Sequence, residues 1–190
     1  LVKSNRVRVD TVIEECSDRY VLADKLFALI KEYEILLIDA KCNQGKTFAM
    51  KKIIEMLTVL NGGKPILIIS VTCRRIHAAD QVSRLEFTSY TVDEAGIQTA
   101  IQINSLGHSK FKNIDTSNGI LLLDEGRAVL SMCNAEKLMG KCSGAIRMLH
   151  VLLRTAGRVV MMCADMNHDW MVRAFAEAAN RPTKMVRYTA

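Results

Sequence analysis

The sequence predicts an α/β fold with a mostly parallel sheet and helices on both of its faces. Apolar, β-rich runs recur along the chain, and stretches of helix length with helical apolar spacing separate most of them. The strand-like runs are apolar at successive positions, as in Ile120-Leu121-Leu122-Leu123. Strands of that kind are typical of parallel sheets, because helices bury such sheets on both sides.

The pattern places each element along the chain. The expected strands span residues 35–40, 66–71, 99–103, 120–123, 159–164 and 184–188. The expected helices span residues 24–32, 47–60, 75–85, 135–154 and 167–179. We expect residues 1–34 to form an N-terminal extension with a leading helix and residues 35–190 to form one main domain.

Composition agrees with a globular domain. The 190 residues are 49% hydrophobic and 24% charged, and the net charge of +6 favours an anionic partner without identifying it. No apolar run approaches the roughly 18 residues of a membrane span, so we expect no membrane partner. The six cysteines form no C-x-x-C pair, and we expect reduced, buried thiols in an intracellular protein. Because the chain begins at Leu1, we expect it to be a piece of a longer protein.

The first expected strand leads into a loop that ends in Gly45-Lys46-Thr47, and a helix is expected directly after it. This order is typical of a phosphate-binding loop, although an ordinary strand-to-helix turn is the alternative. Lys46 is expected to reach the β- and γ-phosphates and to act in catalysis, and Thr47 is expected to bind Mg²⁺. The predicted nucleotide-binding loop consists of Ala40, Lys41, Cys42, Asn43, Gln44, Gly45, Lys46 and Thr47.

The loop differs from the usual G-x-x-x-x-G-K-[ST] pattern at two positions. Ala40 replaces the first glycine, and Asn43 stands in the middle of the loop. Alanine adds only one methyl group, and asparagine tolerates a left-handed backbone better than most residues. We expect the loop to accommodate both residues.

A second apolar run, Ile120 to Leu123, ends in Asp124-Glu125. This run predicts a Walker B strand. Asp124 is expected to hold the Mg²⁺ shell, and Glu125 is expected to orient and activate the attacking water. Two solvated acids at a strand end are the alternative interpretation.

Polar residues at other strand ends suggest further contacts. Thr72, Arg74 and Arg75 follow one strand, and Asn104 and Ser105 follow another. Arginines at that edge suit phosphate, whether of a nucleotide or of a nucleic-acid backbone, and a solvated helix start is the alternative.

The expected strand over residues 159–164 leads into Asp165 and Asn167. Either residue suits sensing of the γ-phosphate or capping of the following helix, and both interpretations stay open.

Taken in order, these segments resemble motifs I, Ia, Ib, II and III of superfamily 2 helicases, and among them the herpesvirus replication origin-binding proteins. The residues that carry the resemblance are 40–47, 70–75, 102–106, 124–125 and 164–167. The resemblance implies that residues 35–190 form the first RecA-like, ATP-binding P-loop NTPase domain of a helicase. Two departures are Asn43, where the family usually has glycine, and Gly126-Arg127 after the paired acids.

The resemblance further implies an ATP- and Mg²⁺-dependent motor that translocates on or unwinds single-stranded DNA. It implies partners in a second RecA-like domain, in the same or another chain, and in other replication proteins. It also implies a viral or mobile-element origin, with the host nucleus as the site of action for a viral protein and the cytoplasm otherwise. We expect this chain to bind ATP and to hydrolyse it poorly alone. The alternatives are a non-enzymatic nucleotide-binding switch or scaffold and a nucleotide kinase.

Overall fold

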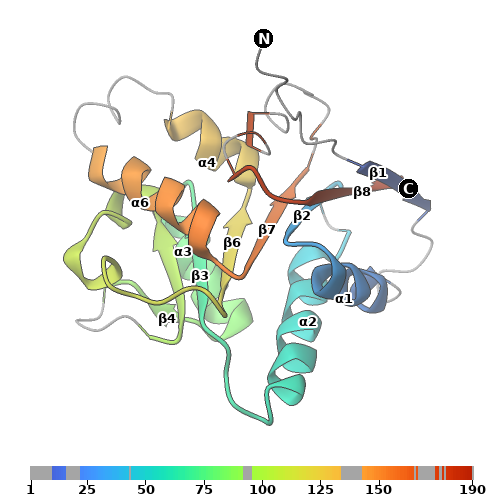
Figure 1. Cartoon of the computed structure of the whole chain (residues 1–190), viewed down its shortest axis with the longest axis horizontal. Coiled ribbons are helices and arrows are strands. Elements are labelled where there is room, and N and C mark those ends of the chain that lie inside the picture. Colours follow the sequence, from blue (N-terminus) through green and yellow to red (C-terminus); the bar gives the residue numbers. More distant parts are fainter. Residues whose placement is uncertain are drawn as a thin grey trace.

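The parallel sheet expected from the sequence is present and has eight strands in the order β1-β8-β2-β7-β6-β3-β5-β4 (Figure 1). Every pair of neighbouring strands runs parallel. The predicted α/β class is therefore confirmed. The computed structural model describes residues 10–15, 22–42, 44–91, 96–133, 143–164, 166, 174, 175, 177 and 179–189.

The expected strands lie within about two residues of their observed positions. The strands are β1 Asp10–Glu15, β2 Ile35–Asp39, β3 Ile68–Thr72, β4 Thr88–Ser89, β5 Gln98–Gln102, β6 Ile120–Asp124, β7 Arg158–Cys163 and β8 Thr183–Thr189. The sequence analysis missed β1 and the short β4. Although β1 belongs to the predicted N-terminal extension, it pairs with β8 along its whole length.

Helices occupy the connections between the strands. They are α1 Leu22–Glu32, α2 Lys46–Leu60, α3 Arg75–Leu85, α4 Gly126–Cys133 and α6 Ser143–Thr155, with two short 3-10 helices at Ile103–Ser105 and Ser109–Phe111. The helix expected over residues 135–154 is present from Ser143, and its first part lies outside the described residues. The sequence analysis did not predict α4.

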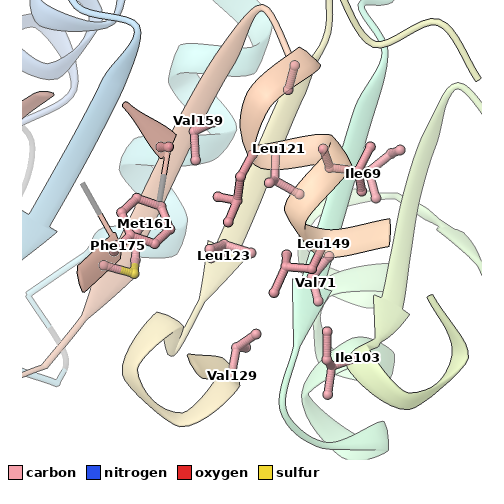
Figure 2. Packing of buried hydrophobic residues seen from close by; sticks show 14 of the residues in the cluster. Ile69, Val71, Ile103, Leu121, Leu123, Val129, Leu149, Val159, Met161 and Phe175 are labelled. Atoms are coloured by element: carbon pink, nitrogen blue, oxygen red, sulfur yellow. The ribbon is translucent and has the colours of Figure 1, made fainter. Parts of the chain in front are cut away.

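Successive residues of each central strand face opposite layers of helices. In β6, Leu121 and Leu123 belong to a cluster that also contains Val129 of α4 and Leu149 of α6 (Figure 2). Ile120 and Leu122 belong to the second cluster, together with buried residues of α1, α2 and α3. The uniformly apolar strands therefore reflect burial on both faces, as expected.

Because all strands are parallel, their carboxyl ends lie along one edge of the sheet. The loop after β2, the acids after β6 and the arginines after β3 all lie at this edge. Among the described residues, no helix is both long enough and apolar enough to cross a membrane.

Candidate nucleotide-binding site

The loop between β2 and α2 has the strand–loop–helix arrangement that a phosphate-binding sequence requires. The backbone N–H of Ala40 donates to the carbonyl of Cys163 on β7, 3.1 Å away, which fixes the start of the loop. At its end, Gly45 has φ 76° and ψ 18° and precedes the first residue of α2. That left-handed conformation favours glycine, so the Gly45-Lys46 junction is a local requirement of the turn.

Lys46 folds back across the loop. Its Nζ donates to the carbonyl of Ala40 at 2.7 Å and to the carbonyl of Lys41 at 3.0 Å. A second bond within the loop joins the backbone N–H of Lys41 to Oε1 of Gln44, at 2.7 Å. The ammonium group of Lys46 therefore lies at the loop, where we expect the phosphates.

The side chain of Ala40, the first residue of the predicted loop, faces the core. It is buried, with 1% of its surface exposed, and packs in the core between the sheet and the helices α1 to α3. Its methyl group therefore occupies the apolar layer, which explains why the first glycine of the usual pattern is dispensable here. Asn43 lies outside the described residues.

Asp124, the last residue of β6, is held by hydrogen bonds to both of its oxygens. Oδ1 accepts from the backbone N–H of Glu125 at 3.1 Å, and Oδ2 accepts from Nε2 of Gln81 at 2.8 Å. In turn, Oε1 of Gln81 accepts from the hydroxyl of Ser70 at 2.5 Å. Since Gln81 and Ser70 are buried, this chain of bonds fixes the orientation of the Asp124 carboxylate.

The sequence analysis did not single out Gln81, which lies within the expected helix over residues 75–85. A signal was present, since Gln81 lies one turn beyond Ala78 on the buried face of α3. A glutamine on such a face needs polar partners.

Glu125 turns the chain from β6 into α4. Its φ of 51° is left-handed, and its carbonyl accepts from the N–H groups of Ala128 and Val129 in the first turn of α4. The next residue is Gly126, where a Cβ would lie 2.2 Å from Cγ of Met161 on β7. The departure from the helicase pattern at Gly126 thus has a packing reason: α4 passes too close to β7 for a side chain.

The predicted phosphate and magnesium residues line one open cavity of about 790 Å³ at the carboxyl edge of the sheet. Lys46 and Thr47 come from the start of α2, and Asp124 and Glu125 come from the end of β6. The cavity is also lined by Cys42, Gly45, Phe48, Cys73, Arg74, His77, Asp80, Arg84 and Ala128. Of the other predicted loop residues, Lys41 and Gln44 do not line it.

A second cavity, of about 690 Å³, adjoins the first. Cys73, Arg74, Glu125 and Ala128 line both cavities. The second cavity is further lined by Gln102, Arg127, Ser131, Met132, Cys163 and Ala164. Glu125 and Arg74 therefore lie at the boundary between the two.

Asp39, directly before the loop, joins three segments. It is 6% exposed. Oδ2 accepts from Nε of Arg187 on β8 at 3.0 Å, and Oδ1 accepts from the backbone N–H of Met166 at 3.0 Å. Asp39 thus ties the start of the phosphate loop to the segment after β7 and to β8. Asp165, a predicted nucleotide contact, and Asn167 lie outside the described residues.

The residues predicted to contact nucleic acid differ in their burial and in whether they line a cavity. Thr72 is fully buried and its hydroxyl donates to the carbonyl of Arg74 at 3.0 Å, so it supports the backbone of the turn. Arg74 and Arg75 are exposed, but only Arg74 lines the cavities. Asn104 is exposed and Ser105 is half-buried, both on the 3-10 helix after β5.

The thiols are not uniformly buried as expected. Cys42 on the phosphate loop is exposed, whereas Cys73 and Cys163 are buried. Burial raises the pKa of both Cys73 and Cys163 above the ordinary thiol value, because a thiolate loses hydration there.

The chain matches no protein-family model and no curated protein. It is similar to a solved structure of the Aeropyrum pernix ORC2 protein in ADPNP-ADP complexes, with 13% sequence identity and a TM-score of 0.48. The match covers 98% of this chain and 52% of the ORC2 chain, so this chain spans about half the length of that protein.

Proposed function

We propose that the chain binds ATP with Mg²⁺ as the first motor domain of a DNA helicase or replication-initiation protein related to superfamily 2. The observation that carries the proposal is the convergence of Lys46, Thr47, Asp124 and Glu125 on one cavity. These residues come from two segments far apart in the sequence, and together they supply a phosphate-binding cation, a hydroxyl and two carboxylates.

Each group has a role in phosphoryl transfer. Lys46 neutralises charge on the β- and γ-phosphates, while Thr47 and Asp124 hold the Mg²⁺ shell. Glu125 accepts a proton from the attacking water. Mg²⁺ held by Thr47 and Asp124 would supply positive charge that stabilises the negative charge developing during transfer. The fixed carboxylate of Asp124 supports this assignment, since metal ligands are usually oriented by a second hydrogen-bonded group.

Single-stranded DNA is the proposed partner at the same edge of the sheet. Arg75 and Asn104 are exposed at the carboxyl ends of β3 and β5, where their side chains suit backbone phosphate. The adjoining cavity adds hydrogen-bonding groups from Gln102, Arg127 and Ser131. A second RecA-like domain would complete the ATPase site in this proposal.

Equilibrium titration with a fluorescent ATP analogue tests the nucleotide site. Lys46→Ala should weaken binding at least tenfold, because a charge-assisted contact of this kind is worth about 1.5–3 kcal/mol. Lys64→Ala is the matched control, since Lys64 is exposed in the turn after α2 and lines neither cavity. Equal affinities in the two variants would contradict the phosphate-binding assignment.

The motor part of the proposal has a separate test. ATP hydrolysis by the natural full-length protein should increase when single-stranded DNA is added. Nucleotide binding without turnover, and without any response to DNA, would favour the alternative of a nucleotide-dependent switch or scaffold.

A further inference from the structure

We infer that Arg74 binds the γ-phosphate of the nucleotide from within the same chain, and that the adjacent Arg75 does not. The inference rests on the proposed function, because it requires a nucleotide at the loop that ends in Lys46 and Thr47. It revises the expectation that both arginines contact nucleic acid. The two residues differ in one respect: Arg74 lines the nucleotide cavity and Arg75 does not.

The strand register brings Arg74 to the Walker B acids. In the parallel pair of β3 and β6, Val71 lies opposite Leu123. Asp124, the last residue of β6, and Glu125 come next, so the chain that leaves β3 passes beside them. Cys73 and Arg74 follow β3 directly and line the same cavity as both carboxylates.

The backbone at Arg74 is held in place. Its carbonyl accepts the buried hydroxyl of Thr72 at 3.0 Å and the N–H groups of His77 and Ala78 at 3.1 and 3.2 Å. These bonds fix the residue at the extended position before the first turn of α3. A fixed backbone with an exposed side chain lets a guanidinium meet a ligand at a small cost in backbone entropy.

The charge of Arg74 is available to a ligand. Arg84, the other arginine of this cavity, is paired with Asp80, with Nε and Oδ1 2.8 Å apart. Arg74 forms no ion pair with any residue in the described part of the chain. Arg74 thus has no carboxylate partner there and lies on the wall of the cavity that Lys46 and Thr47 also line. Such an arginine suits a terminal phosphate because its planar guanidinium can donate two hydrogen bonds.

This placement gives Arg74 a role that Lys46 does not have. Lys46 lies at the loop, where it would neutralise the β-phosphate that ATP and ADP share as well as the γ-phosphate. Arg74 lies on the β3 and β6 side of the cavity, where we expect it to contact the γ-phosphate alone. Because Arg74 also lines the second cavity, its engagement with ATP would withdraw its charge from that cavity. The γ-phosphate would thereby alter the surface proposed for DNA.

The test compares two arginines that are adjacent in the sequence. Arg74→Ala and Arg75→Ala remove the same charge, and affinities for fluorescent ATP and ADP analogues are measured with Mg²⁺ in the natural full-length protein. Arg74→Ala should weaken ATP binding roughly ten- to hundredfold and ADP binding less than about threefold. Arg75→Ala should leave the ratio of the two affinities unchanged. Arg74→Lys should recover part of the loss, since it restores charge without the planar fork.

Three other outcomes would overturn the inference. If Lys46→Ala lowers both affinities while Arg74→Ala lowers neither, the nucleotide site stands and Arg74 is no part of it. If Arg74→Ala leaves the ratio of the ATP and ADP affinities unchanged, weakens single-stranded DNA binding and lowers its salt slope by roughly 0.7, the residue contacts backbone phosphate instead. If the wild-type protein binds neither nucleotide, the proposed function itself fails. Thermal unfolding of each variant checks that the fold is retained.

Discussion

Gln81 on α3 donates a hydrogen bond of 2.8 Å from Nε2 to Oδ2 of Asp124 at the end of β6, across 43 positions of sequence. Together with the backbone N–H of Glu125, which donates to Oδ1, this bond holds the carboxylate in one orientation at the wall of the cavity. The Asp124 carboxylate fixes which end of the amide faces it, because it only accepts, and the Ser70 hydroxyl then donates to Oε1. Gln81 is thus a positioning residue for the proposed magnesium ligand.

The first prediction concerns this bond. Gln81→Met keeps the length of the side chain and removes its donor, so Asp124 becomes free to rotate. We expect the Mg²⁺ concentration that gives half-maximal ATP binding to rise roughly tenfold or more, as is typical when the partner of a metal ligand is lost. Titration of Mg²⁺ at a fixed concentration of a fluorescent ATP analogue measures this change.

Gln98→Met is the control for that experiment, because Gln98 on β5 donates to the carbonyl of Ile66 and lines neither cavity. The loss of an acceptor for buried Ser70 should also lower the free energy of unfolding of Gln81→Met by about 1–3 kcal/mol. An unchanged Mg²⁺ requirement in a folded Gln81→Met protein would remove Gln81 from the site.

The second prediction separates binding from chemistry. Glu125→Gln should leave Mg²⁺–ATP affinity within about threefold of wild type and reduce hydrolysis at least a hundredfold, since an amide cannot accept the proton of water. Asp80→Asn is the matched control, because it removes a carboxylate from the same cavity without touching the proposed base. Turnover and affinity are measured on the same preparation. If Glu125→Gln hydrolyses ATP at the wild-type rate, another residue must act as the base.

Much of the fold was predictable because strands that are buried on both faces are apolar at successive positions of the sequence. The apolar runs placed β2, β6 and β7 within about one residue, and Gly45-Lys46-Thr47 placed the start of α2. By contrast, α4 was missed because it begins at Gly126, a residue that a propensity argument excludes from a helix. Its position follows from the close approach to Met161, a contact between distant segments.

Candidate site residues could be predicted where they belong to one local sequence motif. Contacts between residues of two distant segments could not be predicted. Lys46 and Asp124 follow from local motifs. Gln81 could not be assigned to Asp124, and Arg187 could not be assigned to Asp39, because each pair depends on which strands become neighbours. Arg74 and Arg75 have the same local sequence signal, and only the cavity separates them.

The third prediction tests the packing reason for Gly126. A methyl group there would lie 2.2 Å from Cγ and 2.4 Å from Sδ of Met161, which is 2% exposed. We expect Gly126→Ala to lower the free energy of unfolding by about 1–3 kcal/mol, since overpacking outweighs the gain in helix propensity. Denaturant unfolding measures the change. In a Met161→Ala background, where the collision is absent, Gly126→Ala should cost less, and an equal cost in both backgrounds would contradict the packing argument.

The last prediction uses the thiols as reporters of the cavity. Cys42 is exposed and lines the cavity, whereas Cys73 and Cys163 are buried and have raised pKa values, so they remain neutral thiols near pH 7. Because the thiolate is the reactive form, a maleimide should modify Cys42 well before the other two.

Mg²⁺–ATP should slow the modification of Cys42 in proportion to site occupancy and should have no such effect in Lys46→Ala. Peptide mass spectrometry over a time course follows each thiol separately. Equal rates for Cys42 and Cys73 would contradict the burial of Cys73. A Cys42 rate that saturating Mg²⁺–ATP leaves unchanged in a protein shown to bind it would place the nucleotide away from this loop.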